Sequence, residues 1–127
     1  MSTYDKGLAL RKQVLGAAHV ERSLKVAAED GFTRDLQRLV TEFGWGEIWG
    51  RPGLTLRERS LLNLALLTAL NRPHELRTHV RGALNNGVTE AEMREVFLHT
   101  IAYCGFPAAI DSFRVAKDVL DEAKKPA

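Results

Sequence analysis

The sequence has a single cysteine, Cys104, among its 127 residues. One cysteine excludes an intrachain disulfide, a CxxC redox pair and any zinc site built on two or more thiolates. Cys104 has no neighbouring histidine or other base in the sequence. We therefore expect it to be a small buried apolar side chain and not a nucleophile.

Long apolar runs are also missing. The longest uninterrupted stretch in the middle of the chain is Leu64 to Leu67, whereas a membrane-spanning helix needs about 20 apolar residues. Residues 1–13 interleave charged and apolar side chains and never form the apolar block of a secretory signal. We therefore expect a cytoplasmic protein with no membrane partner.

A strong charge of one sign is absent as well. The 18 Lys and Arg residues against 16 Asp and Glu leave a net charge of only +2, which gives no broad basic surface for nucleic acid. The hydrophobic share of 45% excludes a disordered chain. A chain of this length is expected to form a single domain, here spanning residues 1–127.

Strand signals are missing too, because the apolar residues repeat with the spacing of helices. The sequence predicts an all-α fold of about six to seven helices. The expected helices cover about residues 3–15, 20–29, 33–43, 55–70, 73–86, 89–103 and 107–122. Between them, the segment from Gly44 to Gly53 holds four of the ten glycines. Glycine is costly inside a helix, so we expect an irregular connection or a short helical turn there.

The expected helix around Leu61 to Leu70 is apolar on nearly every side. A surface helix shows one apolar stripe, so this helix must be enclosed by its own domain or shared with another subunit. The few remaining helices can barely enclose it. Self-association is therefore the favoured interpretation, and we expect a homo-oligomer.

The densest cluster of ionisable groups lies in residues 71–79. Glu75 and His79 are four residues apart, so they share a helix face, and Arg72 lies one turn before Glu75. A carboxylate beside an imidazole fixes its tautomer and favours its protonated form, which would make His79 a proton donor. The alternative is a solvated pair on a helix surface.

The other histidines give no metal-binding pattern. His74 faces away from His79 and is expected to cap the helix or to be solvated. His99 is expected in the core near Phe97, and His19 is expected in a turn. None of them pairs with another histidine or carboxylate at a convincing ligand spacing, so we expect no metal site.

The tryptophan segment is a second candidate site. Trp45 and Trp49 supply large apolar walls, while Glu47 and Arg51 supply opposite charges. This combination suits a pocket for a small anionic organic ligand. The alternative is a pair of core tryptophans flanked by two solvated charges.

Three motifs, WGRPGL, LLNLALL and YCGFPAA, give the sequence a wider resemblance. From about Gly7 to Ala123 it resembles the 4-carboxymuconolactone decarboxylases. The same superfamily includes the alkylhydroperoxidase-D-like proteins, which need a CxxC followed by a histidine. Here Arg72 and Glu75 occupy the positions of the two cysteines, and His79 occupies the position of the histidine.

The resemblance implies an alkylhydroperoxidase-D-like helical fold and a cofactor-free carboxy-lyase that assembles as a homohexamer. The implied reaction converts 2-carboxy-2,5-dihydro-5-oxofuran-2-acetate to 4,5-dihydro-5-oxofuran-2-acetate and CO2, in the β-ketoadipate pathway of protocatechuate catabolism. The substrate, a small lactone dicarboxylate, carries its own electron sink, so no metal or organic cofactor is implied.

On this interpretation the candidate residues take the following roles. His79 stabilises the developing charge and donates the proton, and Glu75 orients it. Arg51 or Arg72 holds the acetate arm, with Arg81 behind them. The walls of Trp45 and Trp49 exclude water, and Glu47 lies beside them.

Three alternatives remain from the sequence. The chain could decarboxylate a related lactone, it could be a peroxidase-like member of the superfamily, or it could be a non-catalytic helical binding or assembly protein. The lack of a second cysteine weighs against the peroxidase-like alternative.

Overall fold

The computed structural model describes residues 1–126 and confirms the all-α prediction, with seven α-helices, one π-helix and no strand in that part of the chain. Ala127, the last residue of the expected domain, lies outside the described residues. No described helix is both long and apolar enough to cross a bilayer. The elements are α1 (Thr3–Leu15), α2 (Ala17–Asp30), α3 (Arg34–Leu39), η1 (Val40–Trp49), α4 (Leu56–Ala69), α5 (Pro73–Asn85), α6 (Glu90–Cys104) and α7 (Phe106–Ala123).

The chain forms two compact units, Met1–Thr55 and a second that begins at Leu56. The first contains α1, α2, α3 and the π-helix η1, and the second contains α4 to α7. Each unit has its own packing. The assignment of the whole chain to one domain stays a prediction.

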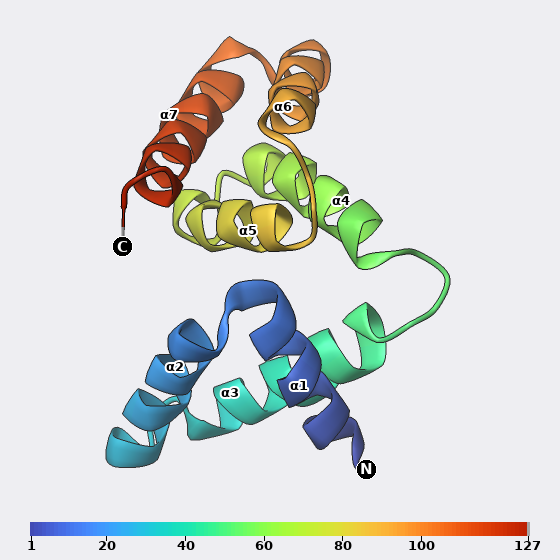
Figure 1. The fold of residues 1–127 in the computed structure, drawn as a ribbon, viewed down its shortest axis with the longest axis vertical. Helices are drawn as coiled ribbons and strands as arrows, with labels where there is room; N and C mark the ends of the chain where they lie inside the picture. The colour runs from blue at the N-terminus through green and yellow to red at the C-terminus, as the bar shows by residue number, and fades with distance from the viewer. Residues whose placement is uncertain (127) are drawn as a thin grey trace. The chain divides into compact units, whose positions relative to one another are not determined.

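In the first unit, α1 packs against η1 (Figure 1). Ser2 caps α1 by accepting a hydrogen bond from the Asp5 backbone N–H at 3.0 Å, which satisfies a donor that the helix leaves open. Farther along, the buried Arg11 donates to the Thr41 hydroxyl oxygen at 3.1 Å. This buried polar link ties α1 to the start of η1.

One expectation about the first unit holds only in part, and a second is wrong. The segment from Gly44 to Trp49 is helical and belongs to η1, so the irregular connection begins only at Gly50. The entropic cost of glycine is offset here by close helix packing, since a Cβ on Gly46 would lie 2.5 Å from the Thr3 carbonyl oxygen. In addition, α2 begins at Ala17, which places His19 inside a helix and not in a turn.

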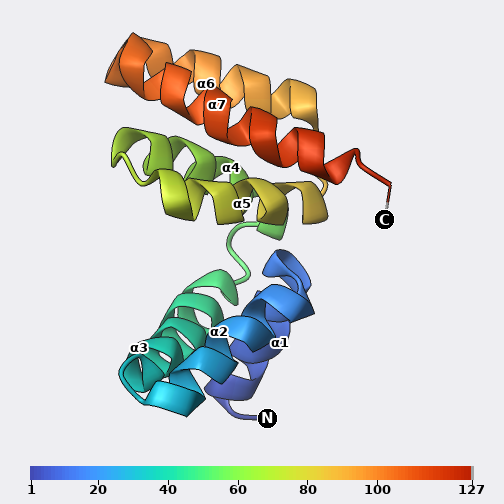
Figure 2. The same ribbon diagram turned by 90° about the vertical axis from the view of Figure 1, so that its left-hand side faces the viewer.

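The second unit stacks two helix pairs. Figure 2 shows α6 and α7 lying over α4 and α5. Phe97 and Phe113 meet edge to face with centroids 5.5 Å apart, which fills the space between α6 and α7. The nine buried residues of this core are Leu64, Leu76, Val80, Ala83, Val88, Met93, Phe97, Ala116 and Val119.

The helix ends of the second unit follow local sequence rules. Pro73 occupies the first turn of α5, and Gly87 after this helix has φ +84°. Thr89 and Glu92 form the predicted capping box at the start of α6. These signals depend on neighbouring residues alone, which explains why the sequence predicts them well.

Candidate functional site

The four candidate residues of the second unit lie on or next to α5. Arg72 is the residue before its first turn and is exposed, as is Glu75 one turn later. His79 lies farther along the same helix and is only 9% exposed. The structure therefore places two exposed charged groups on the helix that also carries a largely buried imidazole.

His79 contacts the neighbouring helix α4 through Asn63. The side-chain nitrogen Nδ2 of Asn63 lies 3.4 Å from His79 Nδ1. Asn63 was not among the predicted site residues, because it lies within the apolar run LLNLALL. The signal was present, because Asn63 is the one amide side chain between Leu61 and Leu70, and an amide removed from water in an apolar helix needs a polar partner.

Arg81 has a structural partner on another helix. Arg81 and Arg77 on α5 both pair with the carboxylate of Glu122 on α7. The hydrogen bond from Arg81 and the charge of Arg77 hold the pKa of Glu122 below its ordinary value, although partial desolvation opposes the shift. Arg81 is thus engaged in an ion pair between two helices, whereas Arg72 donates to the carbonyl oxygen of Asn71 at 3.4 Å.

The first unit carries the tryptophan segment on η1. Trp45 and Trp49 stack with centroids 4.6 Å apart, and they are 5% and 9% exposed. Glu47 and Arg51 are exposed. The rings are thus buried and the two charged side chains are exposed, while both the pocket-wall role and the core-tryptophan alternative stay predictions.

Two further residues differ from expectation. His99 is exposed and not in the core, because the buried stripe of α6 runs through Met93, Phe97 and Thr100 and leaves position 99 off that stripe. Its ring lies 5.2 Å from that of Tyr103. Cys104 is half-buried, so the expected full burial is also wrong. His74 is exposed, as predicted.

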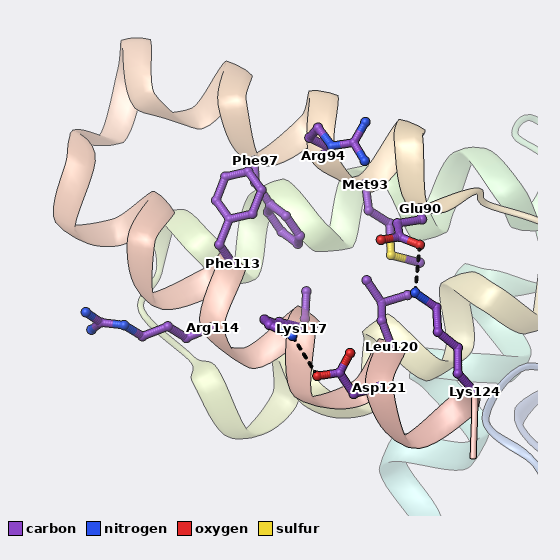
Figure 3. Close-up of a pocket in the computed structure, with 11 residues that line it drawn as sticks. Glu90, Met93, Arg94, Phe97, Phe113, Arg114, Lys117, Leu120, Asp121 and Lys124 are labelled. Atoms are coloured by element: carbon purple, nitrogen blue, oxygen red, sulfur yellow. Dashed lines mark hydrogen bonds and ion pairs between the residues drawn. The ribbon is translucent and has the colours of Figure 1, made fainter. Parts of the chain in front are cut away.

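A groove of about 410 Å³ lies between α6 and α7 (Figure 3), and none of its described lining residues is a candidate residue. Two of the cations that line it are paired at its rim, Lys117 with Asp121 at 2.8 Å and Lys124 with Glu90 at 3.3 Å. Within the described residues, no group of three or more His, Cys, Asp or Glu side chains could hold a metal ion.

Comparison with known proteins adds what the geometry alone lacks. Residues 34–118 match the model of the carboxymuconolactone decarboxylase family. The chain is 45% identical to the nitrosuccinic acid decarboxylase npaB of Metarhizium robertsii over 119 residues, which cover 94% of this chain and 82% of that protein. It is 44% identical to the 4-carboxymuconolactone decarboxylase of Acinetobacter baylyi over 119 residues, 94% of this chain and 87% of that protein. The chain therefore belongs to the carboxymuconolactone decarboxylase family.

Proposed function

We propose that this protein is a 4-carboxymuconolactone decarboxylase, a cofactor-independent carboxy-lyase of protocatechuate catabolism. The observation that best supports the proposal is the 44% identity to a 4-carboxymuconolactone decarboxylase over 94% of the chain. The substrate is 2-carboxy-2,5-dihydro-5-oxofuran-2-acetate, and the products are 4,5-dihydro-5-oxofuran-2-acetate and CO2.

The substrate makes this reaction possible without a cofactor. Its C2 bears both the departing carboxylate and the acetate arm, and it adjoins a C=C bond conjugated with the lactone carbonyl. When the bond between C2 and the carboxylate breaks, CO2 leaves. The electron pair moves through the conjugated system to the lactone carbonyl oxygen, which gives a dienolate. A proton then adds to C4, which completes the product.

The protein must hold the acetate arm, stabilise the charge on the lactone carbonyl oxygen and protonate C4. We assign these three tasks to named residues. Arg72 holds the acetate arm beside the N-terminal end of α5, where the helix dipole favours anions. Arg51 is the second candidate for this contact. His79 donates a hydrogen bond to the lactone carbonyl oxygen or a proton to C4, and Glu75 helps to orient it. Donors aimed at developing charge give large rate gains.

A second substrate is supported by the relative named as a nitrosuccinic acid decarboxylase. In both nitrosuccinate and 4-carboxymuconolactone, C2 bears a carboxylate and an acetate arm. C2 is also attached to a group that can accept the electron pair on an oxygen atom, the nitro group in one and the conjugated lactone carbonyl in the other. Loss of CO2 from C2 of nitrosuccinate leaves a nitronate, which gains a proton at the same carbon to give 3-nitropropanoate. A site with one arginine for the acetate arm and one donor for the sink oxygen suits both reactions.

The decisive experiment offers both substrates to the purified protein and follows CO2 release and product formation by NMR. We expect turnover of 4-carboxymuconolactone with a kcat/KM at least about tenfold above that for nitrosuccinate. The opposite ranking would favour the second substrate. Turnover of neither, with binding retained, would favour a non-catalytic binding protein, and thiol-dependent peroxide turnover would favour a peroxidase-like protein.

We also propose that the protein works as a homo-oligomer, a hexamer by its resemblance, in the cytoplasm. Leu62 and Leu66 on α4 and Leu70 directly after it are spaced four residues apart and are 49%, 54% and 61% exposed in the single chain. Three leucines in such a row form an apolar stripe that a second subunit would cover. Light scattering coupled to gel filtration tests this, and a 14 kDa particle would contradict it.

A further inference from the structure

The contact between Asn63 and His79 limits which ring nitrogen carries a hydrogen. The amide nitrogen Nδ2 of Asn63, 3.4 Å from His79 Nδ1, has two hydrogens and can only donate. With the Asn63 amide oriented so that Nδ2 donates, Nδ1 accepts and carries no hydrogen. An imidazole without a hydrogen on Nδ1 is neutral, and its one N–H lies at Nε2.

We infer that Asn63 is a positioning residue that holds His79 as the neutral imidazole with its hydrogen on Nε2. The consequence of this assignment for catalysis rests on the proposed function. A neutral ring can donate a hydrogen bond from Nε2 to the dienolate or nitronate oxygen. It is a poor acid for carbon, because giving up its only N–H proton would leave an imidazolate.

The role of His79 is then to stabilise the dienolate or nitronate oxygen. Asn63 shares with Glu75 the proposed role of orienting the imidazole. Protonation of C4 then falls to another donor.

The surroundings of the pair favour a fixed geometry. Asn63 is half-buried on α4, and the next residue, Leu64, is fully buried in the core of the second unit. On α5, His79 is followed by Val80, which is also fully buried. Both polar side chains therefore project from helices whose adjacent residues are locked by packing, which is the arrangement needed to orient a reacting group.

The first test needs no substrate. Protein labelled with ¹⁵N at histidine is studied by NMR near neutral pH, and the His79 signals are assigned by their loss in His79→Leu. We expect one ring nitrogen of the unprotonated type at Nδ1 and one of the protonated type at Nε2. A hydrogen on Nδ1, alone or in an imidazolium ring, would overturn the inference.

Two substitutions of Asn63 extend the test. A carboxylate only accepts hydrogen bonds, so Asn63→Asp should move a hydrogen onto Nδ1. Asn63→Leu removes the donor and should give a mixture of the two tautomers, with kcat lowered about tenfold and KM changed less than about twofold. Asn85→Asp, at an exposed position on α5, is the matched control and should leave the spectrum and kcat unchanged.

The outcomes separate the inference from the proposed function. If neither substrate is turned over but the His79 spectrum responds to Asn63 as expected, the tautomer assignment stands and the proposed function fails. If turnover is found but Asn63→Leu keeps the wild-type tautomer and kcat, the proposed function stands and the positioning role fails. The spectrum decides alone if Asn63→Asp does not fold, because Asn63→Leu and the wild-type protein still report on Nδ1.

Discussion

Gly7 on α1 touches the backbone of Gly46 on η1, since a Cβ atom at position 7 would lie 2.7 Å from the Gly46 nitrogen. The same atom would lie 2.1 Å from the Thr41 carbonyl oxygen. Neither neighbour is the end of a flexible side chain that could move aside. The first unit is thus built on two helices that approach each other through glycine.

We therefore expect Gly7→Ala to destabilise the protein by about 1–3 kcal/mol, because the added methyl group forces the two backbones apart. The free energy of unfolding in urea measures this effect. Gly44→Ala is the matched control, since a Cβ there meets no atom within 4 Å. Equal stability of the two variants would contradict the glycine contact.

A second prediction concerns the buried hydroxyls of Thr68 and Ser112. Thr68 donates to the Leu64 carbonyl oxygen at 2.7 Å, so its oxygen accepts the hydrogen of Ser112 at 2.8 Å. Thr68→Val leaves the Ser112 donor buried without its acceptor and should cost about 1–3 kcal/mol in unfolding free energy. The double variant with Ser112→Ala should cost less than the sum of the two single variants. Simple additivity would show that the two hydroxyls are not coupled.

The third prediction tests His79 in catalysis. His79→Leu introduces an apolar side chain of similar bulk and removes the N–H donor, so kcat should fall at least about 10²-fold. His74→Leu changes an exposed histidine on the same helix and should retain wild-type kcat. Steady-state decarboxylation by folded protein, checked by circular dichroism, provides the measurement. Near-normal turnover by His79→Leu would remove this residue from the mechanism.

The fourth prediction distinguishes Arg72, which directly precedes α5, from Arg81 on α5. Arg72→Met should lower kcat/KM about 10- to 100-fold, because a charge-assisted contact to the substrate carboxylate is lost. Arg81→Met should leave kcat/KM near wild type and cause a small loss of stability, since Arg81 pairs with Glu122. The reverse pattern in kinetics and urea unfolding would assign substrate binding to Arg81.

The fifth prediction follows from the pKa of Glu122, which Arg81 and Arg77 hold below its ordinary value of 4.5. A carboxyl group with a lowered pKa in the folded state stabilises it above the ordinary pKa and loses this contribution as the pH falls through the folded pKa. Wild type should therefore exceed Glu122→Gln in stability at neutral pH, and the difference should shrink below about pH 4.5. Unfolding curves of both proteins from pH 7 to pH 3 measure it, and a constant difference would refute it.

The helices of the second unit were predictable because their signals are local. Pro73 starts α5, and Thr89 with Glu92 starts α6, through contacts between residues three or fewer positions apart. The positions of Arg72, Glu75 and His79 along one helix followed from the same periodicity.

The tertiary structure alone decided the rest. The helical course of Gly44–Trp49 depends on Gly46 lying against Thr3, more than 40 residues away in the sequence, and no local propensity contains that contact. The contact between Asn63 and His79 likewise joins residues 16 positions apart on two helices. The sequence by itself thus determined where helices begin and which chemical groups they carry, whereas the packing of those helices determined which groups meet, because such contacts depend on distances between segments and not on order along the chain.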